Sequence, residues 1–372
     1  MRTAAAQAAH QDMIGDRCGV DTGHLWTSVL TLVYAGNLVD AQSYCLTLTR
    51  RQEWQRSDAG RQMLQLLRSR ISFLAGEPPS ARDSIGLMLS GGLHGSLVGL
   101  AMAWGVEELL QYGAAREANL LLLQHDCAAT VDEDLPGRAF LYAARAAVQS
   151  TSGQAQRAVR DYLACGRELS ASGVRNPAVL PWRSRAAVSA FAVQHRDLAQ
   201  ALAREELTAA RMWGAPRAVG EALRALGLVL GGGLGDNELA EAIDLFEVAG
   251  ARNEIIRTAY ELGRRRCDEE DFGAARERFL LAAQHARATG NDHWAQRVDF
   301  ALQRTGLPRK ESLLTKQEAK VAALARAGYG NREIAEQLFL ALRTVEFHLS
   351  AVYRKRGITG RRDLHSITAD FE

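Results

Sequence analysis

The sequence has 372 residues, of which 47% are hydrophobic and 24% are charged, and its formal net charge is +2. This composition is typical of a globular protein of two or three domains, and it excludes both a strongly basic, chromatin-like chain and a long acidic tail. All four lysines lie near the end of the chain, at positions 310, 316, 320 and 355. The first 309 residues therefore cannot hold a Walker phosphate-binding loop or a lysine Schiff base.

The amino-terminal part of the chain predicts neither a secreted protein nor a membrane protein. Its first residues contain no apolar stretch of signal-peptide length. The most apolar window, residues 97–106, contains glycine and is too short to span a bilayer. The five cysteines are odd in number and lack CxxC spacing, which favours reduced thiols over disulfides or a zinc site. We therefore expect a cytoplasmic protein without membrane contact.

A recurring pattern divides the first 306 residues into units of similar length. In each unit a turn residue is followed five positions later by an alanine that opens an apolar run of helical period. The pairs are Gly36 with Ala41, Gly76 with Ala81, Gly113 with Ala118, Gly153 with Ala158, Arg196 with Ala201, Gly235 with Ala240, and Glu270 with Ala275. Successive alanines lie 35 to 43 residues apart, a spacing that indicates stacked helix pairs.

These features predict an all-α body, residues 1–306, built as a helical-repeat solenoid. The chain has only 7 prolines, and its abundant alanine, leucine and arginine favour helices. The repeat resembles the tetratricopeptide (TPR) class, with a longer period. The alternative is a non-repetitive helical domain in which the alanines coincide by chance.

The body contains no recognisable catalytic or metal-binding constellation. The glycine-rich run at 231–235 lacks the Lys-Ser/Thr of a phosphate loop and follows a helical segment, so we interpret it as a connector. The histidines lack HExxH spacing, and no GxSxG motif is present. We therefore expect no enzyme, no metal and no cofactor. Most of the six tryptophans should lie in the core, although one or two could line a groove for a ligand or a partner helix.

The carboxyl-terminal residues predict a helix-turn-helix domain at 313–372, after a basic linker at 307–312. Thr315 and Glu318 form a capping box before a helix over 316–327, which a glycine stop at 328–330 ends. Asn331 is expected to cap a short helix over 332–338. An uncharged turn at 339–342 leads to a third helix from Arg343 or Thr344 to about Lys355, and a fourth short helix follows at 361–368.

The third of these helices is amphipathic. Val345, Leu349 and Val352 form the expected inward stripe. The residues expected to face outward are Thr344, Glu346, Phe347, Ser350 and Arg354. From residue 343 to residue 362 there are six basic residues and one acidic residue, a balance that suits a phosphate backbone. A solvated helical hairpin with coincidental charge is the alternative.

This region closely resembles the LuxR/FixJ-type DNA-binding domain. The matching residues are Leu314, Thr315, Glu318, Val321, Ala325, Gly328, Asn331, Glu333, Ile334, Ala335, Leu338, Thr344, Val345, His348, Leu349, Tyr353, Lys355 and Gly357. The resemblance implies a four-helix domain whose third helix enters the major groove of double-stranded DNA and whose fourth helix contacts a dimer partner. It also implies a role in transcription regulation, with RNA polymerase as a further candidate partner.

The resemblance also assigns roles by position. Base-reading residues would be Thr344, Glu346, Phe347, Ser350 and Arg354. Phosphate contacts would come from Asn331, Arg332, Arg343 and Lys355, and the dimer contact from Leu364 and Ile367. Three positions depart from the family pattern: Glu346 replaces a common lysine, Gln317 a common arginine and Arg356 a common leucine. The carboxylate of Glu346 cannot bind a phosphate, but it can accept a hydrogen bond from cytosine N4.

The body contains the segments LPWRSRAAVSA at 180–190 and EELTAARMWGAPRAVGEALRALGLV at 205–229. On these segments, residues 180–304 are similar to the helical-repeat region of the large ATP-binding LuxR regulators of actinomycetes. Those proteins begin with a P-loop ATPase domain that this sequence lacks. We therefore expect the body to sense a small-molecule or protein ligand, or to supply a dimer surface.

Together these patterns predict a homodimeric transcription regulator that binds a two-fold operator. We expect an activator, with a secondary-metabolite gene cluster as its candidate target. The first alternative is an interaction scaffold whose helix-turn-helix binds protein and does not read DNA. The second is an enzyme with a cryptic site in the body.

Overall fold

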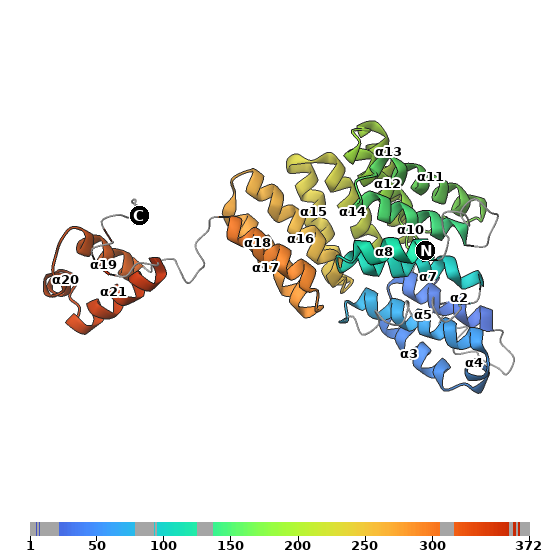
Figure 1. Cartoon of the computed structure of the whole chain (residues 1–372), viewed down its shortest axis with the longest axis horizontal. Coiled ribbons are helices and arrows are strands. Elements are labelled where there is room, and N and C mark those ends of the chain that lie inside the picture. The colour runs from blue at the N-terminus through green and yellow to red at the C-terminus, as the bar shows by residue number, and fades with distance from the viewer. Residues whose placement is uncertain are drawn as a thin grey trace. The chain divides into compact units, whose positions relative to one another are not determined.

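The computed structural model describes residues 5, 7, 22–78, 93, 95–124, 137–305, 316–356, 360, 361 and 364. Within these ranges every regular element is a helix (Figure 1). The chain divides into two compact units, Met1–Thr305 and Gly306–Glu372, which we call the body and the C-terminal unit. The all-α fold expected from the sequence is confirmed.

The body is a series of helices that pair with their neighbours along the chain, as a TPR-like repeat requires. They are α2 (Thr22–Ala35), α3 (Leu38–Thr49), α4 (Gln52–Arg56), α5 (Asp58–Ala75), α7 (Gly95–Gln111), α8 (Ala115–Gln124), α10 (Arg138–Thr151), α11 (Ala155–Ala171), α12 (Trp182–Ala192), α13 (Arg196–Trp213), α14 (Pro216–Leu230), α15 (Gly232–Val248), α16 (Arg252–Asp268), α17 (Phe272–Ala288) and α18 (Asp292–Arg304). None of the helices in the described part of the chain has the length and apolarity needed to cross a membrane.

The turns between helices form largely where the repeat pattern places them. Gly36, Gly76, Gly113 and Gly153 have φ angles of 86°, 67°, 76° and 76°, in the left-handed region that glycine adopts without a steric penalty. Glu270, with a φ of 62°, adopts the same conformation with a side chain present. The alanine five positions later is fully buried in α3, α8, α11 and α17, so the predicted pattern is confirmed in these four helices.

In two repeats the predicted register is wrong. The turn before α13 is made by Gln194, with a φ of 64°, and the buried alanine five positions later is Ala199, whereas Ala201 is exposed. Gly235 lies inside α15, and the turn is made at Gly231. The reason is that alanine-rich helices offer more than one register by sequence, and the packing surface of the neighbouring helix selects one of them.

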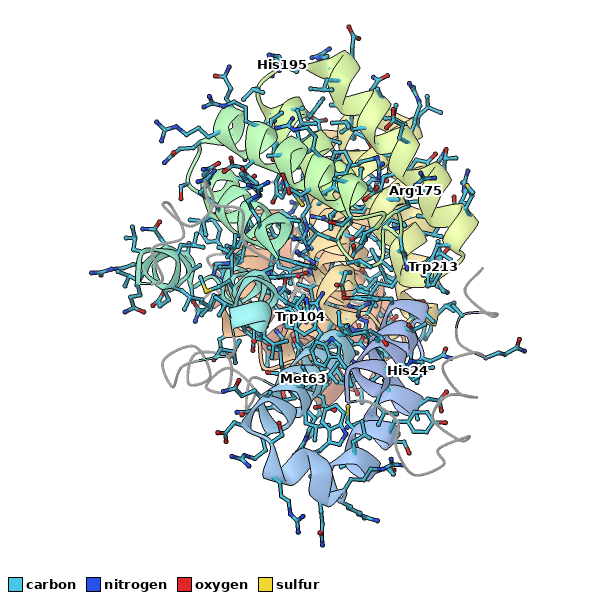
Figure 2. The ribbon with its side chains drawn as sticks, turned by 90° about the vertical axis from the view of Figure 1, so that its right-hand side faces the viewer. His24, Met63, Trp104, Arg175, His195 and Trp213 are labelled. Atoms are coloured by element: carbon cyan, nitrogen blue, oxygen red, sulfur yellow. The ribbon has the colours of Figure 1, made fainter. Side chains whose placement is uncertain are left out.

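The body closes on itself, because side chains from its second half hydrogen-bond to helix ends in its first half. Asn253 donates its amide to the carbonyl of Phe73 at 3.0 Å, and Asn291 donates to the carbonyl of Gln111 at 3.0 Å, in each case across 180 residues. Trp213 donates its indole N–H to the carbonyl of Tyr34 at 2.9 Å, across 179 residues. Figure 2 shows Trp213 beside the amino-terminal helices.

These carbonyls belong to the last turns of α2, α5 and α7, where a helix cannot pair all its carbonyl groups within itself. The carbonyl of Phe73 also accepts from the N–H of Gly76 at 3.1 Å. The side chains that satisfy them stand at the junction of α13 with α14 and at the starts of α16 and α18. One turn of the solenoid therefore takes about 180 residues, and helices far apart in sequence share an enclosed inner surface.

The C-terminal unit has three described helices, α19 (Lys316–Arg326), α20 (Asn331–Gln337) and α21 (Leu342–Arg356). Their bounds agree with the predicted helices to within one or two residues. The core of the unit consists of Val321, Ala322, Ala325, Ile334, Ala335, Val345, Leu349, Val352 and Leu364. Of the expected fourth helix, only residues 361 and 364 fall inside the described part of the chain.

Candidate nucleic-acid interface

The buried face of α21 determines which of its residues face solvent. Val345 and Val352 are 0% exposed and Leu349 is 4% exposed, as the amphipathic pattern predicts. These residues are spaced by four and three, so they form one stripe along the helix that packs against α19 and α20. Because this stripe is held in the core, the opposite face of α21 is presented to solvent.

Four of the five residues predicted to read bases are placed by the structure. Glu346, Phe347 and Ser350 are exposed, with Phe347 at 71%, and Thr344 is half-buried at the start of the helix. The Ser350 hydroxyl donates to the carbonyl of Glu346 at 2.9 Å. Arg354 and Lys355 belong to the last turn of α21, and their side chains lie outside the described part. The structure thus brings a carboxylate, a phenyl ring and a hydroxyl to one open surface.

The candidate phosphate contacts differ in their surroundings. Arg332, at the start of α20, and Arg343, at the start of α21, are both exposed. Asn331 is half-buried, and its side-chain oxygen accepts a hydrogen bond from Arg361 at 2.8 Å. Arg361 also donates to the carbonyls of Ala325 and Tyr329.

Arg361 therefore joins the end of α19 to the start of α20, a role that sequence reasoning missed. In the sequence it is one member of a basic run, and its partners lie 30 to 36 residues away. No local pattern identifies such a contact.

The start of α20 differs from the prediction by one residue. Gly330, and not Asn331, occupies the N-cap position, and its N–H donates to the Glu333 carboxylate at 2.6 Å. Asn331 is the first residue of the helix, which leaves its side chain available to Arg361. The capping box predicted before α19 involves Thr315, which lies outside the described residues.

The turn between α20 and α21 carries an exposed aromatic side chain. Phe339 has a φ of 51° and is 95% exposed. A left-handed conformation costs a residue with a side chain roughly 1–2 kcal/mol, so this position combines local strain with an unburied ring. Phe339 was not among the predicted site residues, and the sequence shows only that the turn has no charge.

The predicted dimer contact needs correction. Leu364 is 0% exposed, since its side chain packs into the core of its own unit with Val321 and Val352. It cannot also face a second copy. Ile367, the other residue expected at that surface, lies outside the described residues.

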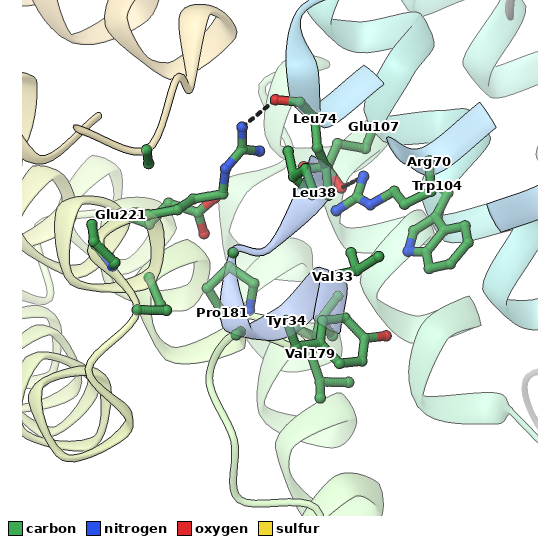
Figure 3. Close-up of a pocket in the computed structure, with 18 of the residues that line it drawn as sticks. Val33, Tyr34, Leu38, Arg70, Leu74, Trp104, Glu107, Val179, Pro181 and Glu221 are labelled. Carbon is green, nitrogen blue, oxygen red and sulfur yellow. Dashed lines mark hydrogen bonds and ion pairs between the residues drawn. The ribbon is translucent and has the colours of Figure 1, made fainter. Parts of the chain in front are cut away.

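A cavity of about 220 Å³ lies inside the body, between helices of its first and second halves. Val33, Tyr34, Leu38, Val179 and Pro181 form its apolar wall (Figure 3). Trp104 also lines it, as the sequence analysis allowed for one or two tryptophans, whereas Trp54 is a fully buried core residue.

The charges around this cavity are mostly paired. Glu107 forms ion pairs with Arg70 at 3.2 Å and with Arg185 at 3.1 Å. Burial alone would raise the pKa of Glu107, but the arginines outweigh burial and lower this pKa to about 2. Figure 3 shows Arg70 and Glu107 side by side next to Trp104. No group of three or more His, Cys, Asp or Glu side chains in the described ranges is placed to hold a metal ion.

Comparison with known proteins places the C-terminal unit in a family. Residues 312–368 match GerE, the luxR family of bacterial regulatory proteins. The oxygen regulatory protein NreC of Staphylococcus aureus, from strains JH9 and Mu3 among others, is 40% identical over 52 residues. That match covers 14% of this chain and 24% of NreC, so the chain shares about a quarter of the length of these relatives.

The fold of the chain is similar to that of a Rap protein solved in complex with Competence and Sporulation Factor. The TM-score is 0.54 at 13% identity, and the match covers 90% of this chain and 98% of that one. The likeness to the apo form of RapI is weaker, with a TM-score of 0.39 at 12% identity. The C-terminal unit is therefore a helix-turn-helix domain of the LuxR family, which follows a TPR-like helical-repeat body in the chain.

Proposed function

We propose that this protein is a sequence-specific DNA-binding transcription regulator that inserts α21 into the major groove. The observation that carries the proposal is the geometry of α21 within a LuxR-family domain. Its inward stripe is buried, so Glu346, Phe347 and Ser350 are held together on the exposed face. A rigid helix with polar and apolar groups on one open face is what direct readout of base edges requires.

In this proposal cations hold the backbone while α21 reads the bases. Arg332 and Arg343 are exposed at the starts of the two helices of the motif, where they can reach phosphates on either side of the groove. Lys355 and Asn331 are the further phosphate candidates. Glu346 would accept from cytosine N4, and Phe347 would contact a thymine methyl group. Thr344, Ser350 and Arg354 complete the base-reading set.

We further propose that the regulator is a homodimer and that it binds a two-fold operator with half-sites about 10 bp apart. Because the Leu364 side chain is buried within its own unit, the proposed dimer contact would be made by Ile367 or by the body. We propose that the protein activates transcription of a secondary-metabolite gene cluster and that it contacts RNA polymerase. The protein would then act in the cytoplasm, where the DNA of bacteria lies. The Rap protein of similar fold was solved with a bound factor, which supports a body that receives a signal by binding.

The test is DNA binding by the full chain, measured by fluorescence anisotropy. In-vitro selection from random duplexes would first define the preferred site. We expect affinity for that site to fall steeply between about 50 and about 200 mM salt, because several phosphate contacts release counterions. Equal affinity for selected and random duplexes at every salt concentration would contradict sequence-specific reading.

An interaction scaffold remains the second candidate, and the exposed rings favour it. Phe339 and Phe347, at 95% and 71% exposure, give the motif an apolar component that a protein partner could cover. This candidate predicts no saturable binding to any duplex even at low salt. The same anisotropy titration therefore separates the two.

A further inference from the structure

The inner surface of the body holds two more cavities, of about 540 Å³ and about 660 Å³. They adjoin each other, since both are lined by Val188, Arg224, Arg257, Trp294 and Arg297. These five residues come from α12, α14, α16 and α18, the first helices of successive repeats. The shared wall, which we call the arginine wall, thus combines three guanidinium groups with an indole ring.

The carboxylates around the arginine wall are mostly engaged with other arginines. Glu254 pairs with Arg217 at 3.2 Å and only more distantly with Arg257, at 3.8 Å. Glu261 pairs with Arg264 at 3.4 Å and with Arg265 at 3.8 Å. In the described part of the chain, neither Glu254 nor Glu261 forms an ion pair with Arg224 or Arg297.

Arg224 has no ion pair and no hydrogen-bond partner among the described residues, and the Nε groups of Arg224 and Arg257 are both buried without an acceptor. Burial, and then the like charge of Arg257, lower the pKa of Arg224 to about 10. Glu221, one helical turn before it, lines the same cavity, and burial and then the nearby Glu254 and Glu107 raise its pKa. The carboxylates of Glu261, Glu221 and Glu254 lie near enough to oppose burial and raise the pKa of Arg224. The buried Nε–H of Arg224 still has no acceptor, and an anionic ligand would supply one.

Flat aromatic rings border the same wall. The Arg297 guanidinium lies over Tyr260 at 4.9 Å and over Trp294 at 5.1 Å from the ring centroids. The Tyr260 and Trp294 rings meet edge to face at 5.3 Å. The cavities therefore offer a surface for a planar group next to the charge that an anion would neutralise.

We propose that the arginine wall binds a small organic anion, an aromatic carboxylate, with its carboxylate on Arg224 and Arg257 and its ring against Trp294. The fork of a guanidinium matches a carboxylate in two parallel hydrogen bonds. Arg297 closes the site from its exposed side. This inference does not depend on DNA binding, because it concerns the body alone and is tested by direct titration.

The experiment is isothermal titration calorimetry of the full chain with three probes. Indole-3-acetate supplies a ring and a carboxylate, indole-3-acetamide supplies the same ring without the charge, and inorganic phosphate supplies the charge without a ring. We expect saturable binding of indole-3-acetate and at least about tenfold weaker binding of the other two, the effect of one lost charge-assisted hydrogen bond or ring contact.

Two variants and a matched control locate the site. Arg224→Gln and Arg297→Gln should each weaken indole-3-acetate binding by roughly tenfold or more. Arg204→Gln makes the same change on α13, where the side chain of the exposed arginine donates to Gln200, and should bind like the parent. Without ligand, Arg224→Gln should melt at the same or a higher temperature, because it removes a guanidinium whose buried Nε–H has no acceptor. Arg297 is exposed, so its variant tests the site even if the change at Arg224 disturbs folding.

Four results would overturn the proposal. One is the absence of saturable indole-3-acetate binding to the parent chain. Another is equal binding of indole-3-acetamide, which would show that the charge is not read. The third is indole-3-acetate binding that survives both Arg224→Gln and Arg297→Gln, which would place the ligand elsewhere. Phosphate binding alone would mean an adventitious ion only and would equally contradict the aromatic site.

Discussion

Two buried glutamates of the body show how neighbouring arginines decide the state of a carboxyl group. Glu107 faces Arg70 and Arg185, and together with Arg257 they lower its pKa to about 2 against the effect of burial. Glu206 has Arg183 at 3.3 Å, but there burial prevails and raises the pKa to about 7. One carboxyl group is therefore ionised at any ordinary pH, whereas the other titrates near neutrality.

The raised pKa of Glu206 predicts a loss of stability as the pH rises. The folded state binds the Glu206 proton more tightly than the unfolded chain does, so the free energy of unfolding falls from about pH 4.5 to about pH 7 and stays low above it. At about 1.4 kcal/mol per pKa unit, the ionised group costs on the order of 3 kcal/mol. Glu206→Gln should therefore be more stable than the parent at about pH 8 and show a flatter profile.

Thermal unfolding between about pH 5 and about pH 8 measures this difference. Glu205→Gln is the matched control, since Glu205 is the preceding residue, is 67% exposed and lies 3.5 Å from the same arginine, Arg183. If both variants followed the pH profile of the parent, the assignment to Glu206 would be wrong.

In the C-terminal unit, substitutions of Glu346 and Arg343 distinguish base reading from phosphate binding. Both side chains are exposed and they lie three positions apart on α21. Glu346→Ala should change the preference at one base pair by roughly 1–3 kcal/mol, because a carboxylate distinguishes cytosine by its amino group. Competition titrations with duplexes altered at each position measure it. Equal losses on specific and random DNA would refute the base-reading role.

Arg343→Ala should instead weaken binding to all duplexes alike. A phosphate contact carries no base information, and its removal should reduce the slope of log affinity against log salt by about one. Salt titrations on the selected site and on a random duplex measure both quantities. A loss confined to the selected site would instead make Arg343 a base-reading residue.

At the scale of single elements, two glycines let α14 and α15 approach closely. A Cβ placed on Gly235 would overlap the carbonyl oxygen of Gly227 and lie 2.8 Å from the Arg265 guanidinium. That arginine donates to the Gly227 carbonyl at 3.0 Å and pairs with Asp236 at 3.2 Å. The absence of a side chain at Gly235 is therefore a packing requirement of this helix pair.

Gly235→Ala should accordingly destabilise the body by about 1–3 kcal/mol, the usual effect of overpacking against backbone. Gly233→Ala is the matched control in the same helix, because a Cβ there meets nothing within 4 Å. The control should be neutral or up to about 1 kcal/mol more stable, since alanine favours the helix. Urea unfolding of both variants gives the comparison, and similar midpoints would contradict the close contact.

At the scale of the whole body, Asn253 tests the closure of the solenoid. It is 2% exposed, it donates to the carbonyl of Phe73, and its side-chain oxygen accepts from Gln111 at 3.3 Å. Asn253→Ala removes the hydrogen bonds that its side chain makes with the Phe73 carbonyl and the Gln111 side chain. We expect a loss of about 2–3 kcal/mol in the free energy of unfolding.

Chemical denaturation of the full chain measures this loss, with Asn237→Ala on the exposed side of α15 as the control. The unfolding transition should move for Asn253→Ala and stay in place for Asn237→Ala. An unchanged transition in both would mean that the contacts across 180 residues contribute nothing to stability.

The sequence alone determined the helical class, most of the turns and the orientation of α21. The repeat of turn residue and alanine, and the stripe of Val345, Leu349 and Val352, depend only on neighbours within a few helical turns. The register errors near Ala201 and Gly235 arose where several small residues satisfy the same local rule, and the neighbouring helix selects between them.

Only the tertiary structure decided which side chains meet across the turn of the solenoid. The hydrogen bonds of Asn253 and Asn291, the unpaired state of Arg224 and the burial of Leu364 each depend on residues distant in sequence. The curvature of a repeat solenoid is the sum of small rotations between successive repeats, so it brings together residues that no local spacing relates. Charge pairing and burial at those positions follow from the curvature of the whole body, so no single segment of the sequence predicts them.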